Sequence, residues 1–261
     1  PEKNTAMDTL NLLDARFLDT PSVAVEQSKN VAVTMAELAE QSMNLSIDLL
    51  DAYNKEKAEQ IVELESQVDR FEDELGSYLV KLSAKNLSEK DSHTLNTILH
   101  CIGDFERISD HARNIKEAAE EMNKKELEFS DKAQQDLKVL GQAVHDILKI
   151  TMLSFQEEDL SLAKQVEPLE EVIDELNLSI KQRHIKRLRK GKCTIELGFI
   201  LSDITNNFER VSDHCSNIAV CLLQVSEDEF DTHAYLGELK QEGNMDFQGK
   251  VMAYRGRYQL P

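Results

Sequence analysis

One eleven-residue sequence occurs twice in this chain. Residues 105–115 read FERISDHARNI and residues 208–218 read FERVSDHCSNI, so eight of eleven positions are identical. A weaker pair lies upstream of these segments, LESQVD at 64–69 and LEEVID at 169–174. The two pairs are offset by 103 and 105 residues. Two independent matches at nearly one offset indicate a duplicated structural unit.

Apolar residues recur with helical spacing through most of the chain. The composition agrees, because Trp is absent and only four Pro and nine Gly occur in 261 residues. Long helices with short connections pack as antiparallel bundles. We therefore predict an all-α fold of two tandem three-helix bundles, each formed by one copy of the repeat. The six predicted helices cover about 21–53, 55–85, 88–123, 130–157, 160–190 and 194–226.

The ends of these helices carry recognisable signals. Pro168 is expected to kink the fifth helix or to mark its start, and Gly191 is a plausible stop after it. Four hydroxyl residues precede helical patterns and are predicted N-caps. They are Thr20, Ser88, Ser130 and Thr194.

Four regions follow from this pattern. The first repeat covers 21–124 and the second covers 128–227. The segment 1–20 is polar and weakly patterned, which is typical of a linker. The tail 228–261 holds four of the nine Gly, and we expect a short helix near 235–240 followed by looser structure.

The charge balance limits the kinds of partner. The chain has 49 acidic and 30 basic residues, a formal net charge of −19. Nucleic acid is therefore not expected as the main partner, because phosphate backbones are bound by an excess of Lys and Arg. The four cysteines form no CxxC pair, which indicates free thiols in a reducing compartment. No uncharged run reaches the roughly 18 residues that span a bilayer, and no signal peptide is visible.

Each repeated segment contains the spacing Glu-x-x-x-Asp. Residues four apart lie on one helix face, where two anions repel each other and a bound cation would remove the cost. In the third and sixth helices the pair borders the apolar stripe, so it can meet the pair of a neighbouring helix. Four carboxylates would then surround one site per repeat, which suits iron, Mn²⁺, Mg²⁺ or Ca²⁺ and, less well, Zn²⁺. The candidate metal ligands are Glu65, Asp69, Glu106, Asp110, Glu170, Asp174, Glu209 and Asp213.

A simpler interpretation of these carboxylates stays open. Glu-x-x-x-Asp is common in an acidic helical protein, and Arg107 and Arg210 can form surface ion pairs with the aspartates three residues later. The histidines at 111 and 214 lie off the Glu–Asp face, so we expect them to pack or to form hydrogen bonds. Ferritin-like di-iron enzymes use Glu-x-x-His instead. No nucleophile–base pattern and no phosphate-cradling glycine loop occurs.

A basic stretch interrupts the acidic trend. Residues 181–192 read KQRHIKRLRKGK and contain seven Lys and Arg residues. Cations at the end of a helix offset its dipole, and this is the interpretation we adopt. The alternative is a docking patch for an anionic membrane surface or an acidic partner.

The repeated motifs resemble those of the PhoU family over roughly 21–226. That family has two tandem three-helix bundles whose Glu/Asp-x-x-x-Asp motifs can hold iron or other metals. The resemblance implies a regulatory role in phosphate uptake, no catalysis, and the eight carboxylates above as metal ligands. Where the family often has Asp before the motif aromatic, the first repeat keeps Asp104 but the second has Asn207. We therefore expect the second site to be weaker or to bind a different ion.

The flanking segments resemble a narrower group. LDARFLDTPSVAVEQSKN at 13–30 and HAYLGELK at 233–240 are similar to the cytoplasmic PhoU-like domain that ends bacterial type II sodium/phosphate cotransporters. The first residue is Pro and not Met, so we expect a fragment or processed chain. The main hypothesis is a cytoplasmic domain at the inner face of the cell membrane, with the membrane transporter portion as its partner in the same polypeptide.

Three alternatives remain. A free-standing PhoU-type regulator would bind transporter subunits and a sensor kinase. A carboxylate-bridged di-metal enzyme would catalyse a reaction, such as oxygen consumption, when iron is bound. A structural helical adaptor would use the carboxylates only as solvated charge. The sequence leaves the oligomeric state open, a homo-oligomer included.

Overall fold

The computed structural model describes residues 5–225 and 244–261, and all of its regular structure is helical. Neither range contains a β-strand. The predicted all-α fold is confirmed, and each long helix lies within a few residues of its predicted range. The long helices are α2 (Pro21–Asp51), α3 (Lys55–Ser83), α4 (Glu89–Lys124), α5 (Asp131–Glu157), α6 (Leu160–Arg189) and α7 (Ile195–Val225).

Several predicted helix signals are present. The Ser88 hydroxyl accepts a hydrogen bond from the Asp91 N–H at 3.1 Å and donates one to the Asp91 carboxylate at 2.7 Å. Thr194 accepts from the Leu197 N–H at 3.2 Å. Gly191 follows α6 with a φ of 64°, the left-handed conformation that favours glycine after a helix.

Other signals differ from the prediction. The side chains of Thr20 and Ser130 form no cap hydrogen bond. Two caps that were not predicted are present at other helices. Asn54 caps α3 and Asp159 caps α6, because an extended backbone at each points the side-chain oxygen at free helical N–H groups. Pro168 does not mark the start of α6, because the helix begins eight residues earlier at Leu160 and continues through the proline.

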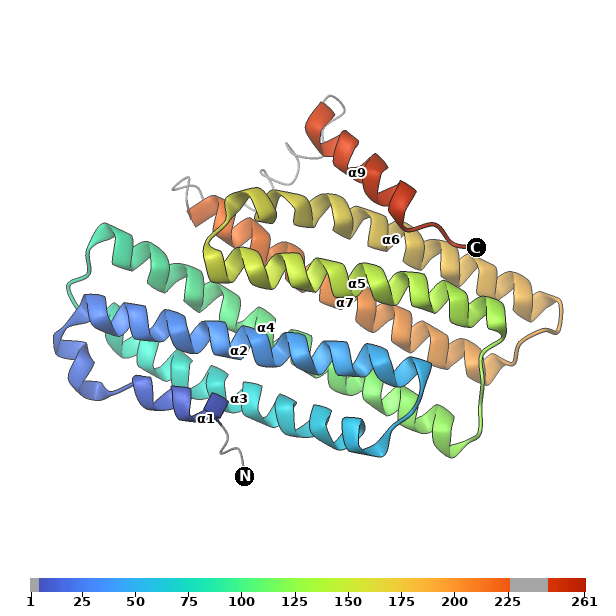
Figure 1. Cartoon of the computed structure of the whole chain (residues 1–261), viewed down its shortest axis with the longest axis horizontal. Coiled ribbons are helices and arrows are strands. Elements are labelled where there is room, and N and C mark those ends of the chain that lie inside the picture. The colour runs from blue at the N-terminus through green and yellow to red at the C-terminus, as the bar shows by residue number, and fades with distance from the viewer. Residues whose placement is uncertain (1–4, 226–243) are drawn as a thin grey trace.

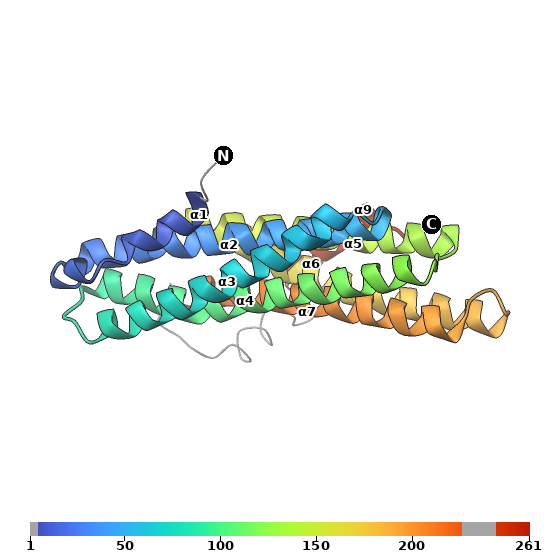
Figure 2. The ribbon, with the colours of Figure 1, turned by 90° about the horizontal axis from the view of Figure 1, so that it is seen from below.

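The six long helices run along the long axis of the molecule (Figure 1). Helices α2 and α5 lie side by side on one face, and α4 and α7 lie on the opposite face (Figure 2). The apolar stripes of both repeats join in one hydrophobic core. Phe105 of α4 meets Phe155 of α5 edge to face at 4.9 Å between ring centroids. The two bundles are therefore packed on each other and not separated by a linker.

The segment 1–20 differs from the expected linker. Its described part forms the short helices α1 (Thr5–Asp8), η1 (Thr9–Leu12) and η2 (Ala15–Asp19). Leu10 is buried in the core, and the Tyr78 hydroxyl donates a hydrogen bond to the Asp14 carbonyl at 3.0 Å. Weak sequence patterning misses such a segment, because its contacts are with distant residues.

The C-terminal region differs in a similar way. Helix α9 (Met245–Arg257) covers residues expected to be loose, and it packs against α6. Phe247, Val251 and Tyr258 are buried there, so tertiary contacts outweigh the glycines at 249 and 256. The short helix expected near 235–240, like the similarity at 233–240, lies outside the described residues. None of the described helices combines the length and apolarity that crossing a bilayer requires.

One buried charge fixes α5 against α6. Asp136 is fully buried and accepts hydrogen bonds from Arg183 at 2.8 Å and from Arg187 at 3.0 Å. These two arginines belong to the basic stretch 181–192, so part of that stretch serves to neutralise a buried carboxylate.

We expect Asp136→Ala to lower the free energy of unfolding by about 3 kcal/mol, because two partly buried guanidinium groups lose their anion. The matched control is Asp51→Ala, which removes an exposed carboxylate 3.6 Å from Lys138 and should cost less than about 0.5 kcal/mol. Urea denaturation measures both. Equal effects of the two substitutions would contradict the assigned role of Asp136.

Candidate functional site

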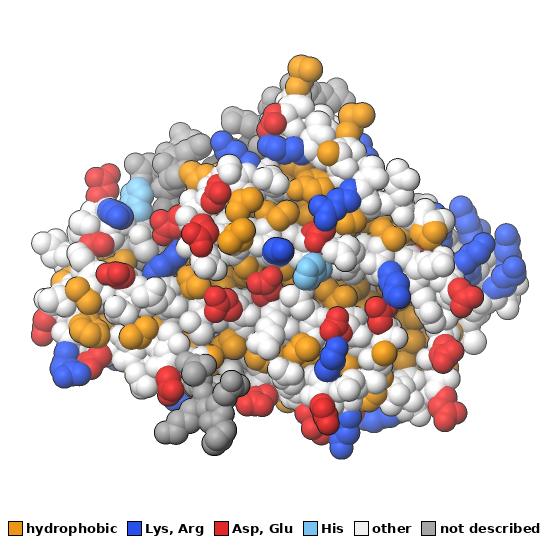
Figure 3. Space-filling view, viewed as in Figure 1, with side chains coloured by type: hydrophobic (Ala, Val, Ile, Leu, Met, Phe, Trp, Pro, Cys, Tyr) orange, Lys and Arg blue, Asp and Glu red, His pale blue; other side chains and the backbone are white. Residues whose placement is uncertain are grey.

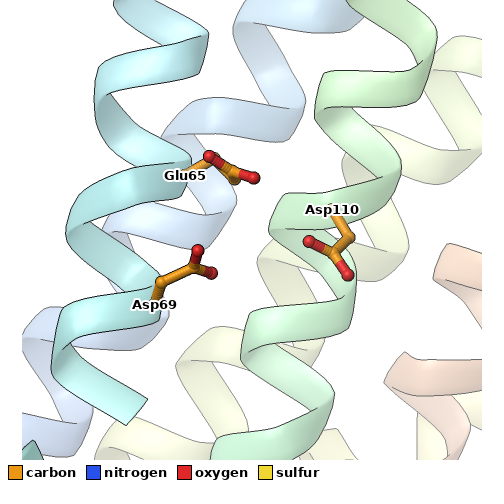
Figure 4. A group of neighbouring side chains, drawn as sticks. All are labelled: Glu65, Asp69 and Asp110. Atoms are coloured by element: carbon orange, nitrogen blue, oxygen red, sulfur yellow. The ribbon is translucent and has the colours of Figure 1, made fainter. Parts of the chain in front are cut away.

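Three carboxylates of the first repeat converge between α3 and α4. Glu65 and Asp69 lie one turn apart on α3 and face Asp110 on α4 (Figure 4). One oxygen from each of the three residues lies within 4.8 Å of the others. Glu65 is buried, Asp110 is half-buried and Asp69 is exposed, so the group is open to solvent on one side.

Glu106 belongs to the same electrostatic environment. Burial raises the pKa of Glu106, and the negative charges of Asp110, Asp69 and Glu72 raise it further. The pKa of Asp69 is raised by desolvation first and then by the charges of Glu65 and Asp110. The carboxylates of this site therefore repel one another, and nearby cations do not fully neutralise them.

Two arginines compensate part of this charge. Arg113 donates a hydrogen bond to Glu65 at 2.6 Å. Arg107 lies 3.1 Å from Asp110 and 3.4 Å from Glu106. The predicted ion pair between Arg107 and Asp110 is thus present, and the simpler interpretation of these carboxylates holds for that contact.

The donor set determines which ligand the first-repeat site suits. Carboxylate oxygens are hard donors that Mg²⁺, Mn²⁺, Ca²⁺ and iron accept, and the group contains no His or Cys. The exposed side of Asp69 leaves room for water to complete a coordination shell. The residues present therefore fit a hard cation and are a poor set for structural zinc.

The second repeat has the same four motif carboxylates in a different setting. Glu209 accepts hydrogen bonds from Asn177 and, at 3.3 Å, from Lys181. Asp213 pairs with Arg210 at 3.3 Å. Glu170 is buried and Asp174 is exposed, and no cluster of three ligating groups forms here among the described residues.

Lys181 explains why the repeats differ. Extending the LESQVD/LEEVID alignment by seven residues places Asn177 opposite Glu72 and Lys181 opposite Gly76. The second repeat thus exchanges a carboxylate for an amide and adds an ammonium group beside Glu209. Both exchanges can be seen in the sequence, three and seven residues after the motif residue Asp174.

Asp104 and Asn207, whose difference was expected to weaken the second metal site, lie at the interface between the repeats. Asp104 lies 2.8 Å from His214, and Asn207 lies 2.8 Å from His111, both across the α4–α7 interface. Neither Asp104 nor Asn207 joins a motif carboxylate cluster. The histidines form hydrogen bonds, as expected, and their rings lie 5.5 Å apart at this interface.

With this geometry in place, comparison with known proteins identifies the family. The family model described as "PhoU domain" matches residues 32–119 and again 137–222. The chain belongs to the PhoU domain family. The two PhoU matches coincide with the two three-helix repeats of the structure.

Relatives with PhoU names match most of the chain. One is the phosphate-specific transport system accessory protein PhoU homolog 1 of Thermotoga maritima, 28% identical over 185 residues, which are 70% of this chain and 79% of the relative. Another is the PhoU homolog of Aquifex aeolicus, 24% identical over 215 residues, which are 82% of this chain and 96% of the relative.

Solved PhoU structures share the fold. The crystal structure of PhoU from Pseudomonas aeruginosa superposes with a TM-score of 0.73 at 18% identity, covering 81% of this chain and 99% of that one. The phosphate transport system regulatory protein PhoU from Streptococcus pneumoniae gives a TM-score of 0.70 at 20% identity, covering 82% and 99%.

We expect Arg113→Gln to lower the free energy of unfolding by about 1 to 2 kcal/mol without added metal, because buried Glu65 loses a charge-assisted hydrogen bond. Arg210→Gln is the matched control. Its partner Asp213 is more exposed, so the loss should stay within about 0.5 kcal/mol. Denaturant titration of the two variants, with a chelator present, makes the comparison. A larger loss for Arg210→Gln would contradict this assignment.

Proposed function

We propose that this chain is a PhoU-type accessory regulator of phosphate transport, acting without catalysis of its own. The proposal is carried by the two PhoU domain matches, which cover both repeats. It is supported by relatives whose names place them in phosphate-specific transport systems.

Of the two PhoU settings, the free-standing regulator has the better support. The relatives named above carry accessory-protein names, and alignment with this chain covers 79% and 96% of their lengths. The domain of a sodium/phosphate cotransporter is the second candidate, and it rests on the segment 13–30 and on 233–240. Reading the gene upstream of Pro1 distinguishes the two, since the second candidate requires membrane helices in the same open reading frame.

The proposed partners follow from the same role. A regulator of this kind would contact transporter subunits at the inner face of the cell membrane, and a sensor kinase in the cytoplasm. The acidic surface, with a net charge of −19, makes nucleic acid an unsuitable partner.

Within this role, the first repeat would hold a hard cation. Glu65, Asp69 and Asp110 would be its ligands, with Glu106 beside them. Their mutual repulsion would be relieved by the metal, and binding would stabilise α3 against α4. In the second repeat, Lys181 already supplies a positive charge to Glu209, so we propose a weaker site there, formed by Glu170, Asp174, Glu209 and Asp213.

We expect Mn²⁺ or Fe²⁺ to stabilise the protein by about 2 to 3 kcal/mol at a metal concentration roughly a hundred times Kd. Asp69→Asn together with Asp110→Asn should abolish most of this gain. The matched control is Asp174→Asn with Asp213→Asn, which should leave most of it. Thermal unfolding with and without metal gives both values. The proposed first-repeat site is wrong if the Asp69/Asp110 variant responds to metal like the parent protein.

Deletion of the gene should change phosphate uptake by the cells that carry it, and expression of the unaltered chain should restore the original uptake. The measurement is uptake of radiolabelled phosphate by cells grown with abundant and with scarce phosphate. Unchanged uptake under both conditions would rule out the regulatory role. The metal titration is independent of this result, so the site and the function are tested separately.

The carboxylate-bridged enzyme remains the competing class. Oxygen consumption by the iron-loaded protein distinguishes it, because metal binding without turnover is the expected result for a regulator. Sustained consumption that depends on Glu65 and Asp110 would favour the enzyme.

A further inference from the structure

The hairpin that joins α6 to α7 forms one end of the molecule. Lys and Arg side chains gather at this end, at the right of the space-filling view (Figure 3). Helix α6 ends there at Arg189, and α7 begins at Ile195. We define the hairpin tip as residues 185–199.

The cations of this hairpin divide into two groups. Arg183 and Arg187 neutralise the buried Asp136, and Lys181 contacts Glu209. Four others are exposed and form no ion pair with any residue that the structure describes. They are Lys186, Arg189, Lys190 and Lys192.

Acidic residues do not offset these four charges. The tip contains a single acidic residue, Glu196, which pairs at 2.7 Å with Lys125, the residue that follows α4. Capping the α6 dipole requires a fraction of one charge. The tip is therefore strongly basic on a protein whose overall charge is −19.

Large apolar side chains are exposed between the cations. Phe199 is 71% exposed, Ile195 68%, Ile185 48% and Leu188 36%. On α7, Ile195 and Phe199 lie four residues apart on one face, opposite the buried Leu197, Ile200 and Leu201. The apolar side chains thus project away from the core.

This combination identifies the kind of surface that the tip fits. Basic side chains are attracted to anionic headgroups, and exposed aromatic and aliphatic side chains partition into the boundary between headgroups and acyl chains. The tip is a projecting end and not a groove, so it suits a deformable surface better than a folded acidic protein.

We propose that the hairpin tip docks the protein on an anionic lipid surface, with the four free cations at the headgroups and Phe199 and Ile195 inserted between them. The docking is peripheral and reversible, since four charges and two to four apolar side chains give modest binding. It does not depend on the proposed phosphate role, because it requires lipid and no transporter.

Flotation with vesicles tests the docking. The parent protein should bind vesicles of phosphatidylcholine mixed with phosphatidylglycerol, and it should not bind pure phosphatidylcholine. Replacing all four tip cations by Gln should weaken binding by more than about a hundredfold at low salt, since each is worth about fivefold. Added salt should reduce the parent's binding as well.

The control variant changes net charge equally at another place. It carries Lys81→Gln, Lys90→Gln, Lys132→Gln and Lys164→Gln, four exposed lysines outside the tip. It should bind anionic vesicles nearly as the parent does. Equal losses in the two quadruple variants would show that net charge and not the tip controls binding, which would overturn the proposal. No binding by the parent would also overturn it and would favour an acidic protein partner.

A second readout reports insertion directly. The chain contains no Trp, so Phe199→Trp introduces the sole indole fluorophore at the tip. Its emission should shift to shorter wavelength on adding anionic vesicles. Met252→Trp, at a residue that is 69% exposed on α9, serves as the control and should not shift. A Phe199→Trp variant that binds vesicles without a shift would contradict insertion.

Discussion

Burial of α4 against α7 is the contact on which the rest of the structure depends. The third helix of each repeat, α4 in the first and α7 in the second, has an apolar stripe, and the two stripes contribute to one hydrophobic core. Phe105 and Phe208, at equivalent positions of the repeated motif, are both fully buried. Side chains in such a core have little freedom to move, because protein interiors pack at the density of organic crystals. The register of α4 and α7 is therefore fixed, and with it the direction of every polar side chain on their flanks.

Helix α4 uses its two flanks for different purposes. The flank toward α3 carries Asp110 and Arg113, which meet the carboxylates of that helix. The flank toward α7 carries Asp104 and His111, which form the polar contacts between repeats. Adjacent residues of one motif thus serve a site within a repeat and an interface between repeats. A change in the packing of α3 on α4 acts on the same helix that holds the repeats together.

The sequence was sufficient for the fold because helical periodicity and a long internal repeat are both local signals. It also brought Glu65, Asp69 and Asp110 together correctly, since i and i+4 spacing fixes a face. It missed the partners that come from outside the motif. Arg113 reaches Glu65 through a long side chain, and Lys181 lies beyond the matched segment. Helix α9 was missed because its stability comes from contacts of Phe247 and Val251 with distant residues, which no local pattern encodes.

Lys181 has a consequence for how the two halves respond to their surroundings. An ammonium group attached to the chain stays beside Glu209 at an effective concentration that does not vary with the solution. A dissolved cation at the first repeat would bind and leave as its concentration changes. Under the proposed function, the first repeat responds to the cation concentration more strongly than the second repeat does. Because both repeats share one core, a cation that binds mainly to the first repeat would change the two repeats unequally, and a partner protein could distinguish one repeat from the other.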